Sequence, residues 1–381
     1  MNSNNYFKFI NDSKLIISEN SRDKLENTNC LSAIVESSLS QDEKERLKSL
    51  LSRSLENLDY NLTKFEKKYC STGLKIYWAE DYKDIFKELR SLISFNKIKT
   101  AYYSSSYIYE EIGLADFLKK EKVKYTDNDA ILQFVDVHKL ISNTGNMLIM
   151  DKNYTKYKQV NSGKINIFIV GIEQIIESLS DADLYIKENV ALSGKDYDSG
   201  FFYRPSRTGR DYLFIVDNGR TNLLSFEKQR LVLTCLHCGL CKKVCPVYEL
   251  VGNKPFNNVF SGPIASVSLP FLENLKSYKH VSYACTLCGN CQKKCPIDIP
   301  IKDLILENRK YFRVTGNVDK SDNKRYSKYK NIVQSRDKMN KSRFFRKKRL
   351  KKFLSKSLRN SILLPKLEKK SFNVQYVKKR K

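Results

Sequence analysis

The chain has 381 residues, with 69 Lys and Arg against 42 Asp and Glu, so its formal net charge is +27. This length suggests two or three domains, and the 41% of hydrophobic residues is too high for a disordered chain. Every apolar run is shorter than the roughly 18 residues that span a bilayer. The N-terminus also lacks the basic-then-apolar order of a secretory signal. We therefore expect neither an integral membrane protein nor a secreted disulfide scaffold.

The positive charge is concentrated near the C-terminus. Residues 311–381 hold 25 Lys and Arg and 4 Asp and Glu, a net of +21, which leaves +6 for residues 1–310. The charge therefore belongs to a tail, and the rest of the chain is only mildly basic.

The first 225 residues have the pattern of a polar N-terminal segment followed by an α/β domain. Residues 1–34 are polar, and a helix is predicted from residue 38 to about 69, with Ser40 as its N-cap and Glu43 three residues on. Short β-rich runs then alternate with amphipathic segments. Strands are predicted at 74–79, 98–104, 123–125, 147–150, 165–170 and 212–217, and helices at 82–93, 110–119, 130–141, 173–180 and 182–191. This alternation predicts a mostly parallel sheet in a domain spanning residues 35–225.

Eight of the ten cysteines lie in a segment predicted to form a second domain, residues 226–312, before the basic tail of residues 313–381. Cys30 and Cys70 stand apart and are interpreted as ordinary thiols. The other eight form two copies of Cys-x2-Cys-x2-Cys-x3-Cys-Pro, at positions 235, 238, 241 and 245 and at 285, 288, 291 and 295.

This spacing is typical of two-cluster ferredoxins, in which three cysteines of one motif and the fourth cysteine of the other hold one cubane. It assigns one [4Fe–4S] cluster to Cys235, Cys238, Cys241 and Cys295, and a second to Cys285, Cys288, Cys291 and Cys245. Gly239 and Gly289 would let the backbone approach the inorganic sulfides. The alternative is a pair of zinc staples, although zinc sites usually pair their cysteines differently.

Several further motifs resemble the lactate-utilisation iron–sulfur protein B family, whose α/β half is called the LUD domain. They are 110–114 (EEIGL), 170–173 (VGIE), 217–220 (DNGR), 245–248 (CPVY), 261–264 (SGPI) and 295–300 (CPIDIP), in matching order from about residue 40 to 310. The resemblance implies a sugar-isomerase/CoA-transferase-like α/β fold, followed by a helical two-cluster domain. It also implies a cytoplasmic system that oxidises L-lactate to pyruvate. The implied partners are a Cys-rich iron–sulfur subunit and a second LUD protein.

The α/β half departs from the family pattern. His138-Lys139 is followed by Thr144-Gly145 after only four residues, and Asn143 replaces the family's Glu. The candidate small-molecule pocket of a shortened LUD domain is therefore predicted to be eroded, whereas all eight cysteines are kept. No catalytic residue is assigned.

Four other features have two interpretations each. Glu110 and Glu111 form either a general-base pair or the acidic first turn of a helix. Residues 217–220 form either a ligand loop or a turn, with Arg220 bonded to the cluster domain; the second is preferred because the motif lies at the domain junction. His138 is either a base or a helix-surface residue, and the second is preferred. His237, within the first cluster loop, either tunes the potential of that cluster or is simply exposed, and exposure is preferred.

The basic tail has apolar positions on one helical face around residues 350–358. This pattern suits an anionic membrane surface, an acidic partner or non-specific nucleic acid, and compositional drift explains it equally. Without a recognised nucleic-acid module, no specific nucleic acid is expected. The resemblance implies a cytoplasmic location, and the basic tail adds the option of peripheral contact at the inner face of the membrane.

Three functions are consistent with these patterns. The first is an iron–sulfur electron-transfer subunit of a complex that oxidises L-lactate, making the chain an oxidoreductase component that shares catalysis with partners. The second is a LUD enzyme or ligand-binding protein that uses the clusters as its own relay. The third is a structural protein stapled by clusters.

Overall fold

The computed structural model describes residues 39–318 except 72, 105, 128–129, 193–196, 206–209, 254–255 and 257–260, together with scattered residues from 324 to 338. The chain divides into two compact units, residues 1–310 and 311–381, and the first contains both sheets and both cysteine motifs. No helix among the described residues is long and apolar enough to cross a membrane. The predicted basic amphipathic helix around residue 350 lies outside the described residues.

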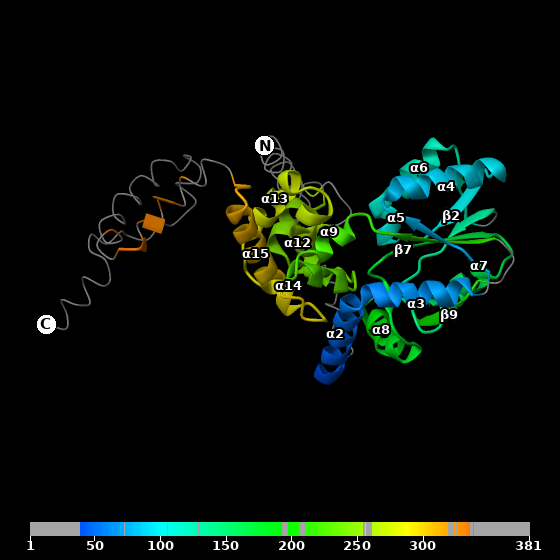
Figure 1. The fold of residues 1–381 in the computed structure, drawn as a ribbon, viewed down its shortest axis with the longest axis horizontal. Coiled ribbons are helices and arrows are strands. Elements are labelled where there is room, and N and C mark those ends of the chain that lie inside the picture. The colour runs from blue at the N-terminus through cyan, green and yellow to red at the C-terminus, as the bar shows by residue number, and fades with distance from the viewer. Residues whose placement is uncertain are drawn as a thin grey trace, which may run out of the picture. The chain divides into compact units, whose positions relative to one another are not determined.

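Two helices precede the sheet (Figure 1). Helix α2, Gln41–Glu56, begins at the predicted capping box: the Ser40 hydroxyl accepts from the Glu43 N–H, and the Glu43 carboxylate accepts from the Ser40 N–H. Helix α3, Leu58–Cys70, follows after Asn57. The single predicted helix is therefore interrupted once.

A six-stranded, fully parallel sheet forms the centre of the α/β part, in the order β1-β10-β7-β4-β2-β3. Its strands are β1 (Ile76–Ala79), β2 (Thr100–Tyr103), β3 (Lys124–Tyr125), β4 (Leu132–Phe134), β7 (Ile165–Gly171) and β10 (Asp211–Val216). The predicted mostly parallel sheet is confirmed. Because successive side chains of a strand point to opposite faces, a strand covered on both faces is apolar throughout.

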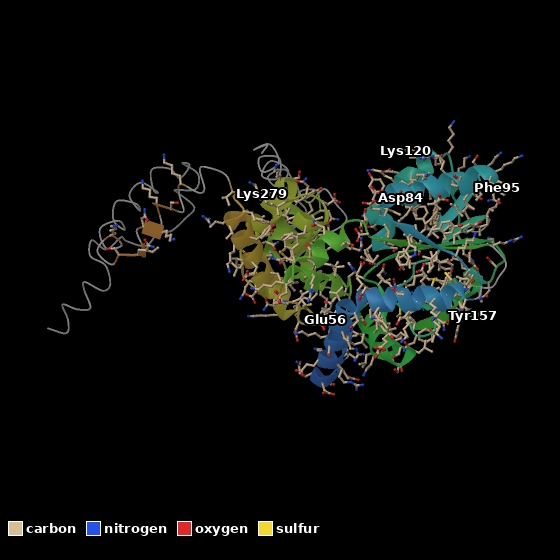
Figure 2. All side chains as sticks on the ribbon, viewed as in Figure 1. Glu56, Asp84, Phe95, Lys120, Tyr157 and Lys279 are labelled. Carbon is tan, nitrogen blue, oxygen red and sulfur yellow. The ribbon has the colours of Figure 1, made fainter. Side chains whose placement is uncertain are left out.

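The two faces of the sheet have separate cores. Ile167 and Ile169 of β7 pack with helix α4 (Tyr82–Phe95) and with α5 (Tyr107–Ile112) and α6 (Leu114–Lys120). Phe168 and Val170 pack on the other face with α3. Charged side chains such as Asp84 and Lys120 lie on the outer surfaces of α4 and α6 (Figure 2).

A second, four-stranded sheet has the order β8-β5-β6-β9. It comprises β5 (Lys139–Ile141), β6 (Asn146–Asp151), β8 (Ile175–Ile176) and β9 (Ser199–Tyr203), with helices α7 (Thr155–Val160) and α8 (Leu179–Leu192) in the intervening chain. Two helix predictions were wrong here. Residues 130–141 form β4, a loop and β5, and β8 occupies part of 173–180, because in both places apolar residues pack as buried strands.

Beyond β10 the described chain is helical. Helix α9 (Arg220–Leu224) and the 3-10 helix η1 (Gln229–Thr234) precede the first cysteine motif. Short helices then lie within or directly after the motifs: α10 (Leu240–Lys243), α11 (Pro246–Val251) and α14 (Asn290–Lys293). The longer helices α12 (Gly262–Leu272), α13 (Leu275–Ala284) and α15 (Ile301–Val314) pack around them. Buried Asn308 joins these elements, because its side chain donates to the carbonyls of Ser266 and Val267 and accepts from Gln229.

Candidate functional site

The two cysteine motifs follow the same backbone path. In each loop the residue two after the first cysteine has a positive φ, 55° at His237 and 60° at Leu287. The glycine four after that cysteine also has one, 73° at Gly239 and 80° at Gly289. Glycine suits this conformation because it has no Cβ to clash with the backbone. A short helix, α10 or α14, then begins in both loops.

Backbone N–H groups point at the sulfurs. The His237 N–H donates to Cys235 Sγ, and the Leu287 N–H donates to Cys285 Sγ, both at 3.3 Å. The fourth cysteine of each motif accepts in the same way at 3.4 Å, Cys245 from Tyr248 and Cys295 from Ile299. Such donors stabilise sulfur as the thiolate, the form that ligates iron.

One group of thiols surrounds Cys235. Burial raises the pKa of Cys235 well above its usual range, and the nearby Cys241, Cys238 and Cys295 raise it further. Burial also raises the pKa of Cys241 to about 12 and that of Cys295 to about 11. Buried neutral thiols of this kind bind metal with release of their protons.

The second group lines one pocket. Cys245, Cys285, Cys288 and Cys291 all border it, beside Gly289 and the apolar side chain of Phe256. Burial raises the pKa of Cys291 to about 12, and Cys285 and Cys245 add to the rise. Four soft sulfur donors around an apolar cradle fit an iron–sulfur cubane.

The two groups lie close to each other, and the second has one exposed thiol. Helix α10 packs on α14, and Cys291 of the second group raises the pKa of Cys241 in the first. Cys291 is buried, whereas Cys288 is exposed. The second group therefore reaches the surface of this unit.

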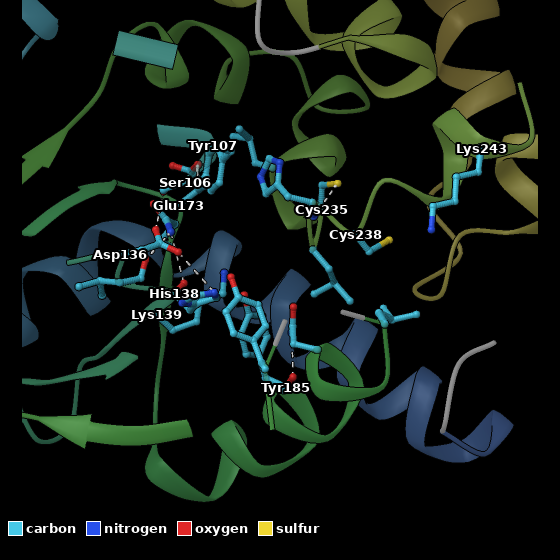
Figure 3. Close-up of a pocket in the computed structure, with 18 residues that line it drawn as sticks. Ser106, Tyr107, Asp136, His138, Lys139, Glu173, Tyr185, Cys235, Cys238 and Lys243 are labelled. Carbon is cyan, nitrogen blue, oxygen red and sulfur yellow. Dashed lines mark hydrogen bonds and ion pairs between the residues drawn. The ribbon is translucent and has the colours of Figure 1, made fainter. Parts of the chain in front are cut away.

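A pocket of about 310 Å³ separates the first cysteine loop from the parallel sheet (Figure 3). Ser106 and Tyr107 follow β2, Asp136 and His138 follow β4, and Glu173 follows β7. Cys235, Cys238 and His237 line it from the cysteine loop. The carboxyl ends of parallel strands are where α/β folds bind ligands. Most of the side chains that line this pocket are polar or charged.

His138 lines this pocket from the loop between β4 and β5, so the prediction that it lies on a helix surface was wrong. Its Nε2 lies 3.5 Å from Asp136 Oδ2, and Asp136 Oδ1 accepts from the Ser106 hydroxyl at 2.5 Å. Burial lowers the pKa of His138 to about 4, against an opposing effect of Asp136. The imidazole is therefore neutral at pH 7.

His237 is exposed, as predicted, and its ring also stacks on Tyr107 with centroids 3.8 Å apart and planes 11° apart. The Tyr107 hydroxyl in turn donates to Glu173 Oε1 at 3.2 Å. The first cysteine loop therefore contacts the α/β part through an aromatic pair.

Glu111, Arg220 and Glu173 form a buried ion-pair triad. Arg220 Nη1 and Nη2 donate to the two Glu111 oxygens at 2.9 and 2.8 Å, and its Nε donates to Glu173 Oε2 at 2.5 Å. Both carboxylates raise the pKa of Arg220, opposing the effect of burial. Arg220 thus pairs within the α/β part, and the predicted bond to the cluster domain was wrong. Glu111 is engaged as a structural ion pair, and neighbouring Glu110 is exposed.

The motif at 217–220 is nevertheless a turn at the junction, as preferred. Asn218 and Gly219 have φ of 44° and 87°. A Cβ on Gly219 would overlap the Leu272 carbonyl oxygen at the end of α12. Asn222, one turn later, donates to the Phe271 carbonyl at 2.5 Å. The turn after β10 therefore packs directly against the helical region.

Sequence reasoning missed Tyr107, Asp136, Lys139, Glu173 and Tyr185 as pocket residues. Four of them lie at or near strand ends. The mistaken helices over 130–141 and 173–180 concealed this signal for Asp136, Lys139 and Glu173, whereas Tyr107 follows a strand that was predicted correctly. Tyr185 reaches the pocket from α8, and only the tertiary fold reveals this.

Fold and site together define an iron–sulfur protein, in which a parallel α/β part precedes a helical region that carries two [4Fe–4S] clusters. Residues 231–299 match the family model for the 4Fe-4S dicluster domain.

The chain is also similar to curated lactate utilization proteins, which confirms the resemblance found in its motifs. It is 25% identical over 351 residues to lactate utilization protein B 2 of Bacillus mycoides (strain KBAB4), covering 74% of each chain. The same identity and coverage hold for lactate utilization protein B of Bacillus cereus (strain AH820) and of Bacillus thuringiensis (strain Al Hakam). No solved structure matches the chain.

Proposed function

We propose that this chain is an iron–sulfur electron-transfer subunit of a system that oxidises L-lactate to pyruvate. The observation that carries the proposal is the pair of four-thiol groups in a dicluster domain, in a chain similar to lactate utilization protein B. Each bound [4Fe–4S] cluster would accept and release one electron at a time.

The ligand assignment proposed is the crossed one. Cys235, Cys238 and Cys241 would be completed by Cys295, and Cys285, Cys288 and Cys291 by Cys245. The pKa effects of Cys241, Cys238 and Cys295 on Cys235 support the first set. The common pocket of the other four cysteines supports the second.

The placement of the thiols supports a direction for the electrons. Cys235 and Cys238 border the pocket at the sheet edge. Cys241 and Cys291 bring the two groups together, and exposed Cys288 offers an exit to an acceptor. Because all four iron corners of each cubane would be held by cysteine, substrate would bind beside the clusters and not on them.

We propose that the protein acts in the cytoplasm. The expected partners are a Cys-rich iron–sulfur subunit and a second LUD protein, with the basic tail of residues 313–381 as a docking segment for an acidic partner or an anionic membrane. The proposed divisions are residues 1–34, 35–225, 226–312 and 313–381; the dicluster match at 231–299 falls within the third.

Anaerobic purification of the full chain tests the redox role. We expect bound iron and sulfide for two cubanes and a dithionite-reducible S = 1/2 EPR signal. Absence of any reducible signal would leave only the structural alternative. Lactate oxidation by the chain without partners would favour the second candidate, a LUD enzyme with its own relay, for which the polar pocket beside Cys235 is the supporting observation.

Two single variants test the crossed assignment. Cys295→Ala should perturb the cluster held by Cys235, Cys238 and Cys241, and Cys245→Ala the cluster held by the later motif. Cys70→Ala, outside both motifs, is the control and should leave both signals unchanged. If each variant lost the cluster of its own motif, the crossed assignment would be refuted.

A further inference from the structure

The pocket between the parallel sheet and the first cysteine loop contains a buried cation. Lys139, the first residue of β5, is only 4% exposed and lines the pocket (Figure 3). Its ammonium lies over the Tyr185 ring, 5.4 Å from the centroid. Burying an ammonium group is costly unless a counter-charge or hydrogen bonds compensate it.

The carboxylates around this pocket are engaged elsewhere. Glu173 bonds to Arg220 and accepts from Tyr107. Asp136 accepts from Ser106 and faces His138. Within the described part of the chain, no carboxylate forms an ion pair with Lys139. An anion entering the pocket would therefore find a cation that no carboxylate of the described residues neutralises by an ion pair.

The Lys139 side chain is mostly protonated, and so positively charged, near neutral pH. Desolvation lowers the pKa of Lys139 to about 8, while Glu173 and Cys235 oppose the shift. Tyr185 and Asn189 of α8 add polar side chains on the same wall. A volume of about 310 Å³ lies at the lower end of the range for small-molecule sites.

We propose that this pocket binds a small monocarboxylate, with the carboxylate paired to Lys139 and a hydroxyl or oxo group among the neighbouring polar side chains. That the bound monocarboxylate is a 2-hydroxy or 2-oxo acid rests on the proposed function. That an anion pairs with Lys139 rests on geometry alone. Bound there, the acid would lie between the sheet edge and the loop of Cys235.

Anaerobic calorimetric titration of the cluster-loaded full chain tests the proposal, with L-lactate, pyruvate and propionate as probes. We expect saturable 1:1 binding of at least one acid. Lys139→Met should weaken it at least tenfold, about 1.4 kcal/mol. Lys139→Arg, which keeps the charge, should retain more of the affinity than the Met variant. The matched control is Lys87→Met, at an exposed lysine of α4, and it should bind like the wild type.

Visible absorbance of the clusters confirms that each variant is loaded. Absence of carboxylate binding by the loaded wild type, or equal binding by loaded Lys139→Met, would overturn the proposal. Equal binding together with a changed cluster potential would identify Lys139 as a counter-ion of the first cluster instead. None of these outcomes alters the redox test, so the pocket proposal and the electron-transfer proposal fail separately. Binding of propionate alone would support the anion site and refute selectivity for hydroxy and oxo acids.

Discussion

Glu111→Gln should destabilise the α/β part strongly, because Glu111 belongs to the buried triad with Arg220 and Glu173. The side chains of Glu111 and Arg220 are 3% and 1% exposed, so water screens their attraction little. The Glu111 carboxylate accepts twice from Arg220 and once from Asn218. An amide removes the charge and replaces one acceptor with a donor that faces a guanidinium N–H.

The expected loss of unfolding free energy depends on the Arg220–Glu173 ion pair, which the Glu111→Gln variant keeps. Breaking a buried ion pair typically costs about 3–5 kcal/mol. Glu173 would still compensate Arg220, so the lower end, about 3 kcal/mol, is expected. In urea this loss should lower the unfolding midpoint by about 1 M or more.

Fluorescence of Trp78 is a specific probe, because it is the only tryptophan in the chain and lies in β1. Glu110→Gln is the matched control: the same change one residue earlier, at an exposed position, should shift stability by less than about 0.5 kcal/mol. An unchanged midpoint for Glu111→Gln, or equal losses in the two variants, would refute the buried triad.

Three further predictions concern other parts of the first unit. Asn308→Ala should cost the helical region about 2 kcal/mol or more by leaving buried carbonyls unpaired, so the cluster absorbance should disappear at lower urea; an unmoved transition would contradict the role of Asn308. Gly219→Ala should lower the free energy of unfolding by about 2 kcal/mol or more, because alanine is strained at this φ and its Cβ would overlap the Leu272 carbonyl oxygen. Wild-type stability of this variant in urea would contradict the close contact between Gly219 and Leu272. Carboxylate affinity should fall as pH rises through about 8, where Lys139 loses its proton beside Glu173, Tyr185 and Cys235; Lys139→Arg should not show this fall, and a wild-type affinity constant up to pH 9.5 would contradict the assignment.

Local signals predicted much of the fold. The capping box at Ser40 and Glu43 formed as expected because both partners are near neighbours in sequence. The strand at 165–170 was clear because a parallel strand buried on both faces reads as one apolar run. The cysteine spacing was equally informative, because the ligands of a cluster must come from tight loops.

Other features depend on contacts between distant residues. Residues 130–141 contain apolar positions compatible with a helix, and only pairing of β4 with β7 and β5 with β6 selects strands. Arg220 sits 109 residues from Glu111, so no local pattern identifies its partner. Lys139 became a site residue only once the cysteine loop was placed across the pocket.

The order of strands in the large sheet has a consequence for synthesis of the chain. Strand β10 is the last strand of the sheet in sequence, yet it lies between β1 and β7. Until residue 216 has left the ribosome, the facing edges of β1 and β7 have no partner, and such open edges invite aggregation. The chain that fills this gap continues through α9 and η1 into the first cysteine loop. Assembly of the sheet should therefore precede insertion of iron and sulfide during biogenesis.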